Sequence, residues 1–261
     1  MPGEPRGGAS NIAPACGTFA AMNLLIDTGN TRIKWALADG SSLVTRGVVE
    51  HAEVATLPKV WGGLPRINRV LVACVAGPSI REAVEDALDR VDGDIDWVVA
   101  RQQECGVRNG YSEPGKLGAD RWAALIGAYA LGLVPGVIVS AGTALTVDMM
   151  GADGQFAGGI IVPGFRALDA GLRARTALAA ETGTFSAFPT NTEDAITTGA
   201  IDALCGAVER VARRVAATGS TPRVILTGGD AERIAAHLTV PFNRVDDLVL
   251  RGLATIASHK R

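Results

Sequence analysis

Two distant segments of the chain carry the same pattern, an apolar strand, a glycine turn and a second strand. LLIDTGNTRIKW (24–35) aligns without gaps with VIVSAGTALTVD (137–148), and Gly29 falls on Gly142. VLVACVAG (70–77) is similar in the same way to VILTGGDA (224–231). Chance likeness between two strand–glycine–strand segments is the alternative. Because the order of expected elements also repeats, we favour a duplication that yields two similar α/β halves.

Hydrophobic patterning gives the expected elements of each half. Strands are predicted at residues 24–27, 33–38, 43–50, 69–75, 95–99, 137–139, 145–150, 156–162 and 223–226. Helices are predicted at residues 51–61, 80–90, 117–133, 191–217, 231–237 and 247–258. Ser79 and Glu82 have capping-box spacing ahead of the second of these helices. Residues 101–116 form a long polar connection.

Chain length, net charge and cysteine spacing limit the number of domains and argue against a nucleic-acid-binding or zinc-finger protein. A chain of 261 residues allows one large domain or two small ones. Its net charge of −2 provides no basic field for nucleic acid. The four cysteines, which show neither C-x-x-C nor zinc-finger spacing, are expected to be reduced in a cytoplasmic protein. They are Cys16, Cys74, Cys105 and Cys205.

Two segments need separate interpretation. Residues 122–147 lack charge and are long enough to cross a bilayer, but Pro135-Gly136 interrupts them. A helix, a turn and a buried strand explain them better, so no membrane partner is expected. Residues 1–21 are rich in Gly, Pro, Ala and Ser without periodicity, and we predict a disordered extension.

The repeated turns suit phosphate binding. Small residues at a hairpin tip expose backbone N–H groups, and two such turns facing each other can hold a polyphosphate. The hydroxyl groups of Thr28, Thr31 and Thr143 can add hydrogen bonds. Asp27, beside the first turn, is suited to Mg²⁺, directly or through water. The alternative is an ordinary hairpin with an aspartate-capped turn.

Asp120 and Arg121 form a charged pair one turn into the apolar helix predicted at 117–133. One interpretation is a carboxylate that only favours the positive end of the helix dipole. The other is a proton acceptor for a substrate hydroxyl in phosphoryl transfer, with Arg121 binding a carboxylate or orienting Asp120. The residues alone leave both open.

Two further glycine segments were weighed. GYSEPGKL (110–117) fits G-x-x-x-x-G-K, but Leu117 follows in place of Ser or Thr and no strand precedes it, so we exclude a P-loop. Gly228 and Gly229 follow an apolar strand. Their turn can pack a nucleotide base or ribose, or be a plain turn.

Taken together, these segments resemble the type III pantothenate kinase family, which includes Bvg accessory factor-like proteins. The resemblance spans about residues 22–258. It rests on IDTGNTRIKWAL, YSEP (111–114), LGADR (117–121), AGTALTVD, GGIIVPG, NTEDAI from Asn191, and LTGGDA. Each is weak alone, and their common order and spacing make the signal specific.

The resemblance implies a duplicated RNase H-like fold of the acetate and sugar kinase and actin superfamily. Mixed sheets flanked by helices would enclose a cleft between two halves. Residues 22–116 would form the first half with phosphate loop 1. Residues 117–261 would carry the catalytic helix, phosphate loop 2 and a nucleotide-base turn. The implied activity is ATP-dependent phosphorylation of pantothenate to 4′-phosphopantothenate, the first step of coenzyme A synthesis.

The resemblance also implies roles for single residues. Asp120 looks like the general base, and Asp27 lies near Mg²⁺. ATP would contact Asp27, Thr28, Gly29, Asn30, Thr31, Arg32, Ile33, Lys34, Gly142, Thr143, Gly228 and Gly229. Pantothenate would contact Tyr111, Gly118, Ala119, Asp120, Arg121 and Thr192. Thr192 would act from the partner subunit, since members are typically homodimers.

Ser140 departs from the family pattern. Many members carry Asp there, associated with a monovalent cation, K⁺ or NH₄⁺. Because Ser140 lacks that charge, we do not carry the cation site over, and dependence on such a cation stays open, as does the role of Asp148. Two alternative functions are a non-catalytic nucleotide-binding regulator and a phosphotransferase acting on a sugar or acetate.

Overall fold

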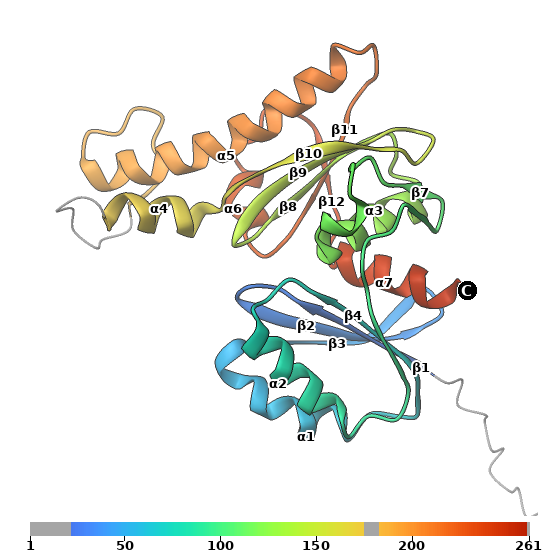
Figure 1. The fold of residues 1–261 in the computed structure, drawn as a ribbon. Helices are drawn as coiled ribbons and strands as arrows, with labels where there is room; N and C mark the ends of the chain where they lie inside the picture. Colours follow the sequence, from blue (N-terminus) through green and yellow to red (C-terminus); the bar gives the residue numbers. More distant parts are fainter. Residues whose placement is uncertain (1–21, 175–182, 260–261) are drawn as a thin grey trace, which may run out of the picture.

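The structure is a computed structural model that describes residues 22–174 and 183–259. In spatial order, one five-stranded sheet contains β3 (Ser42–Glu50), β2 (Arg32–Asp39), β1 (Met22–Thr28), β4 (Ile67–Cys74) and β5 (Asp94–Trp97). The other contains β10 (Phe156–Pro163), β9 (Ala144–Met150), β8 (Gly136–Ala141), β11 (Arg223–Thr227) and β12 (Phe242–Arg244) (Figure 1). Both sheets are mixed and have corresponding strand orders, so the predicted duplication is confirmed.

The remaining elements connect and cover the sheets. The helices are α1 (Leu57–Trp61), α2 (Pro78–Leu88), α3 (Ala119–Ala130), α4 (Phe165–Arg173), α5 (Thr192–Ala216), α6 (Ala231–Ala235) and α7 (Leu248–Ser258). Two 3₁₀ helices, η1 (His51–Thr56) and η2 (Pro114–Lys116), and a small hairpin of β6 (Gln103–Glu104) and β7 (Val107–Arg108) complete the described elements. The predicted extension at 1–21, with Cys16, lies outside the described residues.

The elements stack in layers (Figure 1). Helices α1 and α2 cover the outer face of the first sheet, α3 and α7 lie between the sheets, and α5 covers the second sheet. Leu24 and Ile26 of β1 pack on the α1–α2 side, and Leu25 packs on the α3–α7 side. Ile138 of β8 joins the same middle core. Because successive side chains of a strand alternate in direction, both central strands are buried on both faces.

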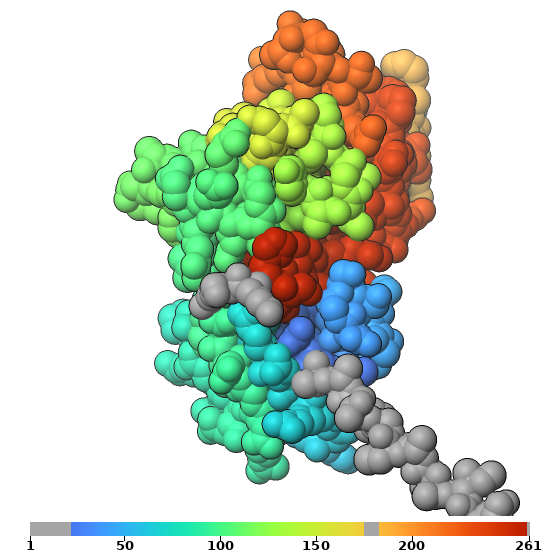
Figure 2. Space-filling view, turned by 90° about the vertical axis from the view of Figure 1, so that its right-hand side faces the viewer, coloured from blue at the N-terminus to red at the C-terminus, as the bar shows by residue number. Residues whose placement is uncertain are grey.

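Helices α3 and α7 touch through their backbones. A Cβ atom at Gly252 would overlap the carbonyl group of Ala123, and one at Gly127 would crowd the carbonyl group of Leu248. Glycine is required for such close approach. Figure 2 shows residues near the C-terminus, in red, filling the space between the two halves. The helix that carries Asp120 is therefore fixed by contacts with both halves.

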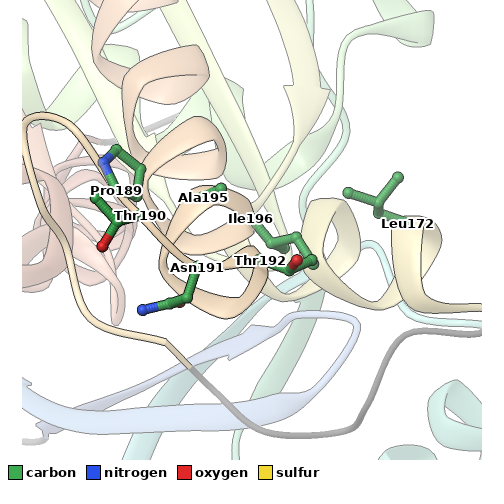
Figure 3. A pocket seen from close by; sticks show the side chains of 7 residues that line it. All are labelled: Leu172, Pro189, Thr190, Asn191, Thr192, Ala195 and Ile196. Carbon is green, nitrogen blue, oxygen red and sulfur yellow. The ribbon is translucent and has the colours of Figure 1, made fainter.

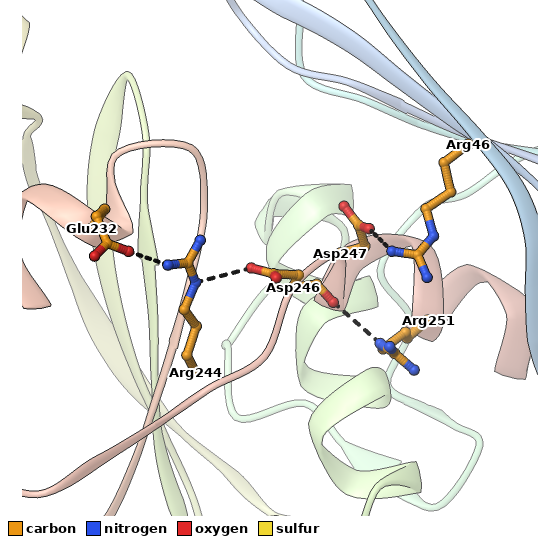
Figure 4. A network of polar contacts seen from close by, with 6 residues as sticks. All are labelled: Arg46, Glu232, Arg244, Asp246, Asp247 and Arg251. Carbon is orange, nitrogen blue, oxygen red and sulfur yellow. Dashed lines mark hydrogen bonds and ion pairs between the residues drawn. The ribbon is translucent and has the colours of Figure 1, made fainter.

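Polar contacts lie between α6 and β3 (Figure 4). Arg244 forms ion pairs with Glu232 and Asp246, and Arg251 donates to the backbone carbonyl of Asp246. Arg46 and Asp247 form a separate ion pair. The Arg46 Nη1 atom lies 2.9 Å from the Asp247 Oδ2 atom and joins the first sheet to the start of α7. Asp247 has a φ of 56°, in the left-handed region that Asp tolerates better than most residues. Exposed pairs of this kind contribute little each.

Several predicted boundaries were wrong. The second hairpin is one residue shorter than the first, because Ala141 pairs with Leu145 whereas Thr28 pairs with Ile33. The ungapped alignment of residues 24–35 with 137–148 is therefore correct as far as Gly29 and Gly142. Beyond the glycines it is shifted by one residue, since Lys34 corresponds to Thr146 in the structure. The helix predicted from Ile80 begins at Pro78 after Gly77, so Ser79 is no cap. The hairpin β6–β7 and strand β12 were missed.

The cysteine and membrane predictions can be compared with the described residues. Cys74, Cys105 and Cys205 are free thiols there, the first two half-buried and the third buried. The uncharged stretch at 122–147 divides into α3, a connection, β8 and part of β9. Within the described ranges, no helix combines the length and apolar character needed to cross a membrane.

Candidate active site

The two glycine turns meet at the boundary between the halves. The Oγ1 atoms of Thr31 and Thr143 lie 2.9 Å apart, within hydrogen-bond distance. Each turn is closed by its own backbone. The N–H of Gly29 donates to the Arg32 carbonyl at 3.1 Å, and that of Gly142 donates to the Ala144 carbonyl at 3.0 Å. The structure thus brings together two preformed turns with small polar tips, a geometry suited to phosphate oxygens.

Neighbouring elements hold each turn in place. The His51 Nε2 atom, at the start of η1, lies 2.9 Å from the carbonyl oxygen of Gly29. At the second turn, Cβ atoms at Gly164 and Gly228 would overlap the carbonyl groups of Gly142 and Ala141, so these backbones are in direct contact. Sequence reasoning missed His51, because nothing local links a distant histidine to a turn carbonyl.

Asp27, the next-to-last residue of β1, lies in a crowded acidic environment. Its register partner on β2 is Lys34. The pKa of Asp27 is raised to about 7, mainly by burial and then by the nearby carboxylates of Asp120 and Asp247, while Lys34 opposes the shift. The boundary between the halves therefore carries an excess of carboxylate over cation.

This excess fits a divalent cation. Buried carboxylates of like sign are stabilised when a cation joins them. Within the described parts of the chain, no three His, Cys, Asp or Glu side chains already form a metal-binding group. Mg²⁺ suits this arrangement, because it is commonly held by one or two carboxylates, substrate phosphates and water. Asp27 is the residue suited to that cation.

Asp120 is the second residue of α3, which begins at Ala119 rather than at the predicted Leu117. The carboxylate thus lies in the first turn, not one turn into the helix. Its Oδ1 atom accepts the N–H of Arg121 at 2.7 Å and lies over Gly118, where a Cβ atom would be only 2.6 Å away. Burial raises the pKa of Asp120, and Arg121 opposes that shift. A raised pKa makes a carboxylate a stronger base.

Arg121 is only 7% exposed, and its side chain donates three hydrogen bonds to two residues. Its Nε and Nη2 atoms donate to the two carboxylate oxygens of Asp148, the first at 3.1 Å. Its Nη1 atom donates to the hydroxyl oxygen of Tyr111 at 2.8 Å. The Tyr111 ring stacks on Phe156 with centroids 5.7 Å apart. The structure therefore brings Tyr111 and Arg121 together, as the resemblance implies, and adds Asp148 on β9.

The other residues predicted to contact ATP differ in how exposed they are and in whether they already have a partner. Arg32 pairs with Glu50, and their Nε and Oε1 atoms lie 2.8 Å apart. Thr28 and Ile33 are fully buried, and the Ile33 side chain belongs to the core of the first half, so neither residue offers an exposed group to ATP here. Lys34 is half-buried, whereas Asn30, Thr31 and Thr143 are exposed. Gly228 and Gly229 directly follow β11, next to the second turn.

Thr192 lies apart from these groups. It begins α5, at the end of the molecule away from α3 (Figure 1). There an open pocket of about 590 Å³ is lined by Leu172, Pro189, Thr190, Asn191, Thr192, Ala195 and Ile196 (Figure 3). One chain thus does not bring Thr192 to Asp120.

Comparison with known proteins gives the family. The family model "Type III pantothenate kinase" matches residues 23–214. A protein of that name from Aromatoleum aromaticum is 45% identical over 237 residues, covering 90% of this chain and 98% of its own. The chain belongs to the type III pantothenate kinase family. Another relative of the same name, from Azoarcus sp., is 45% identical over 240 residues and is covered over 91% of both chains.

Solved structures support the fold. A Baf family protein from Campylobacter jejuni has a TM-score of 0.55 at 19% identity, covering 89% of this chain and 96% of its own. Component A of (R)-2-hydroxyglutaryl-CoA dehydratase from Acidaminococcus fermentans has a TM-score of 0.53 at 15% identity, covering 92% and 97%. Such distant likeness concerns architecture alone, and it agrees with the expected duplicated fold.

Proposed function

We propose that this chain transfers the γ-phosphoryl group of ATP to the primary hydroxyl of pantothenate, forming 4′-phosphopantothenate in the first step of coenzyme A synthesis. Family membership gives the reaction. The observation that carries it to this chain is the meeting of two glycine turns, through Thr31 and Thr143, beside the partly buried carboxylates of Asp27 and Asp120. Phosphoryl transfer needs such positioning and charge stabilisation more than covalent chemistry.

In this proposal both turns hold ATP. Residues 27–34 form phosphate loop 1, and Gly142 and Thr143 form phosphate loop 2. The N–H groups and hydroxyls of the two tips bind phosphate oxygens, and Gly228 and Gly229 pack against the base or ribose. Mg²⁺, held by Asp27 with the phosphates and water, would offset the charge on the transferring group. The halves divide at residues 116 and 117.

Asp120 is the proposed general base. It accepts the proton of the pantothenate hydroxyl as that oxygen attacks the γ-phosphorus in line with the leaving oxygen. The raised pKa of Asp120, caused mainly by burial, serves this role because it strengthens the base. Tyr111, Gly118, Ala119 and Arg121 line the pantothenate end, where a remaining N–H of Arg121 suits the carboxylate.

The active enzyme is a proposed cytoplasmic homodimer in which Thr192 completes the partner's pantothenate site. The supporting observations are that α5, which Thr192 begins, starts at the end of the molecule away from α3, and that exposed apolar residues lie near Thr192 in the same pocket or in sequence (Figure 1). Leu172 is 46% exposed and Phe188 is 89% exposed. An apolar surface of this kind is typical of an interface.

The test is ADP release from ATP and Mg²⁺, with and without pantothenate, comparing the wild type with Asp120→Asn. We expect pantothenate-dependent turnover that falls by at least about 100-fold in the variant, since general base catalysis supplies 10²–10⁴-fold. Omitting K⁺ and NH₄⁺ in turn decides whether a chain with Ser140 needs either. A folded, ATP-binding wild type without pantothenate-dependent turnover would instead support the non-catalytic regulator, for which the comparisons give no support.

A further inference from the structure

Asp148 is a buried carboxylate that the proposed reaction does not use. It lies on β9 and is only 2% exposed. Both of its oxygens accept hydrogen bonds from Arg121, so they are committed to one guanidinium group. A buried carboxylate held in this way is neither a free base nor a free metal ligand.

The neighbouring strand is shaped around this carboxylate. Gly159 of β10 is the register partner of Asp148. A Cβ atom at Gly159 would overlap the Asp148 Oδ1 atom, so the glycine leaves the space that the carboxylate fills. On the other side, the guanidinium carbon of Arg121 lies 5.7 Å from the ring centre of Tyr111 and 5.8 Å from that of Phe156. The pair is enclosed by β9, β10 and the segment of Tyr111.

The donors of Arg121 can be counted. A guanidinium group has five N–H donors in a fixed planar arrangement. Asp148 accepts two of them and Tyr111 accepts one. Within the described residues, one N–H on Nη1 and one on Nη2 remain. Because the group is planar, fixing the first two bonds also fixes the directions of those that remain.

We propose that Asp148 is a positioning residue that orients the Arg121 guanidinium group for the carboxylate end of pantothenate. The inference rests on the proposed function.

Asp148→Asn tests this role, since it preserves shape but removes the charge and one acceptor. We expect the KM for pantothenate to rise at least about tenfold, with kcat at saturation and the KM for ATP within about threefold of the wild type. Preference for pantothenate over its alcohol analogue, in which the carboxylate is replaced by a hydroxymethyl group, should fall by a similar factor. Asp153→Asn, at an exposed ion pair with Arg108, is the matched control and should change neither.

An unchanged pantothenate KM and unchanged preference in Asp148→Asn, with an active wild type, would overturn this inference and leave the proposed function standing. A wild type without pantothenate-dependent ADP release would instead remove the proposed function itself. The two failures are therefore distinct.

A double variant keeps the test decisive if Asp148→Asn fails to fold, because removing both charges avoids an unpaired buried ion. We expect Arg121→Gln/Asp148→Asn to have the same kcat/KM for pantothenate as Arg121→Gln, since Asp148 acts through Arg121. A further loss in the double variant, close to the product of the separate effects, would show that Asp148 acts independently and overturn the proposal.

Discussion

The two halves of the molecule share one strand order but differ in charge at corresponding turns. In the first half, Asp27 at the end of β1 faces Lys34 on β2. At the corresponding positions of the second half, Ser140 faces Thr146, both uncharged. The halves differ again after their third strand, where the first has η1 and α1 and the second has α4 and the long α5. The two halves thus share their strand order, whereas only the first half has charged residues, Asp27 and Lys34, beside its glycine turn.

The largest expected effect comes from making the first turn like the second. Asp27→Ser should lower kcat by at least about 100-fold, because the proposal places Mg²⁺ at this carboxylate, and losing that charge would weaken transition-state stabilisation by several kcal/mol. Steady-state kinetics over a range of Mg²⁺ concentrations measures it. Ser140→Ala in the second turn is the matched control, expected within about threefold of the wild type. Equal losses in both variants would mean that the two turns share the same role.

The next effect tests whether the halves share one core. Gly252→Ala should destabilise the protein by about 1–3 kcal/mol, because the new methyl group overpacks the contact between α3 and α7. Urea unfolding measures the free-energy change. Gly206→Ala on α5 is the control, since a Cβ atom there meets nothing within 4 Å. It should stabilise by about 0.5–1 kcal/mol. Equal stability of the two variants would contradict the packing described.

A smaller effect compares the two tips directly. Thr31→Val and Thr143→Val should each raise the KM for ATP about 3–10-fold, the range set by one lost hydrogen bond of about 0.5–1.5 kcal/mol. Thr31→Ser and Thr143→Ser retain the hydroxyl and should stay near the wild type. If only one Val variant is impaired, only that turn binds phosphate.

The smallest effect concerns α5, which the first half lacks. The N–H of Thr184 and the Asn191 side chain bond to the Asp194 carboxylate and lower its pKa. Stability from a lowered pKa is present above the unfolded value, 3.8 for Asp, and is lost as pH falls through the folded value. The protection factors of the amide hydrogens at residues 184–198, which correct for the intrinsic pH dependence of exchange, should therefore fall below about pH 4. Asp194→Asn should remove this pH dependence, and an unchanged profile in that variant would contradict the assignment.

Much of the frame could be predicted from local patterns. The repeat of strand, glycine turn and strand predicted both hairpins. Apolar residues along a strand and a glycine in a turn, here Gly29 and Gly142, determine local structure within a few residues, so the sequence shows them directly. The shorter turn of the second hairpin was missed. With one residue fewer in the turn, the apolar residues of the second hairpin can still be aligned with those of the first without a gap. Strand β12 was missed because Phe242–Arg244 is only three residues long and pairs with β11 from a distance.

The site was predictable only in part. Asp27, Asp120 and Arg121 were singled out by their places beside turns and at a helix start. The pairing of Arg121 with Asp148 was not, because it joins a helix to a strand 27 residues further along the chain and no local signal encodes it. The same holds for His51 on the Gly29 carbonyl and for Asp247 near Asp27. Their roles remain predictions to be tested.

The crossing of α3 and α7 bears on the ancestry of the fold. Each is the helix that follows the fifth strand of its sheet, and each is covered by the other. A chain with only one of these two helices would leave its apolar face exposed to water. An ancestor with a single repeat would therefore have needed a second copy to cover that helix, which is the arrangement of a symmetric dimer.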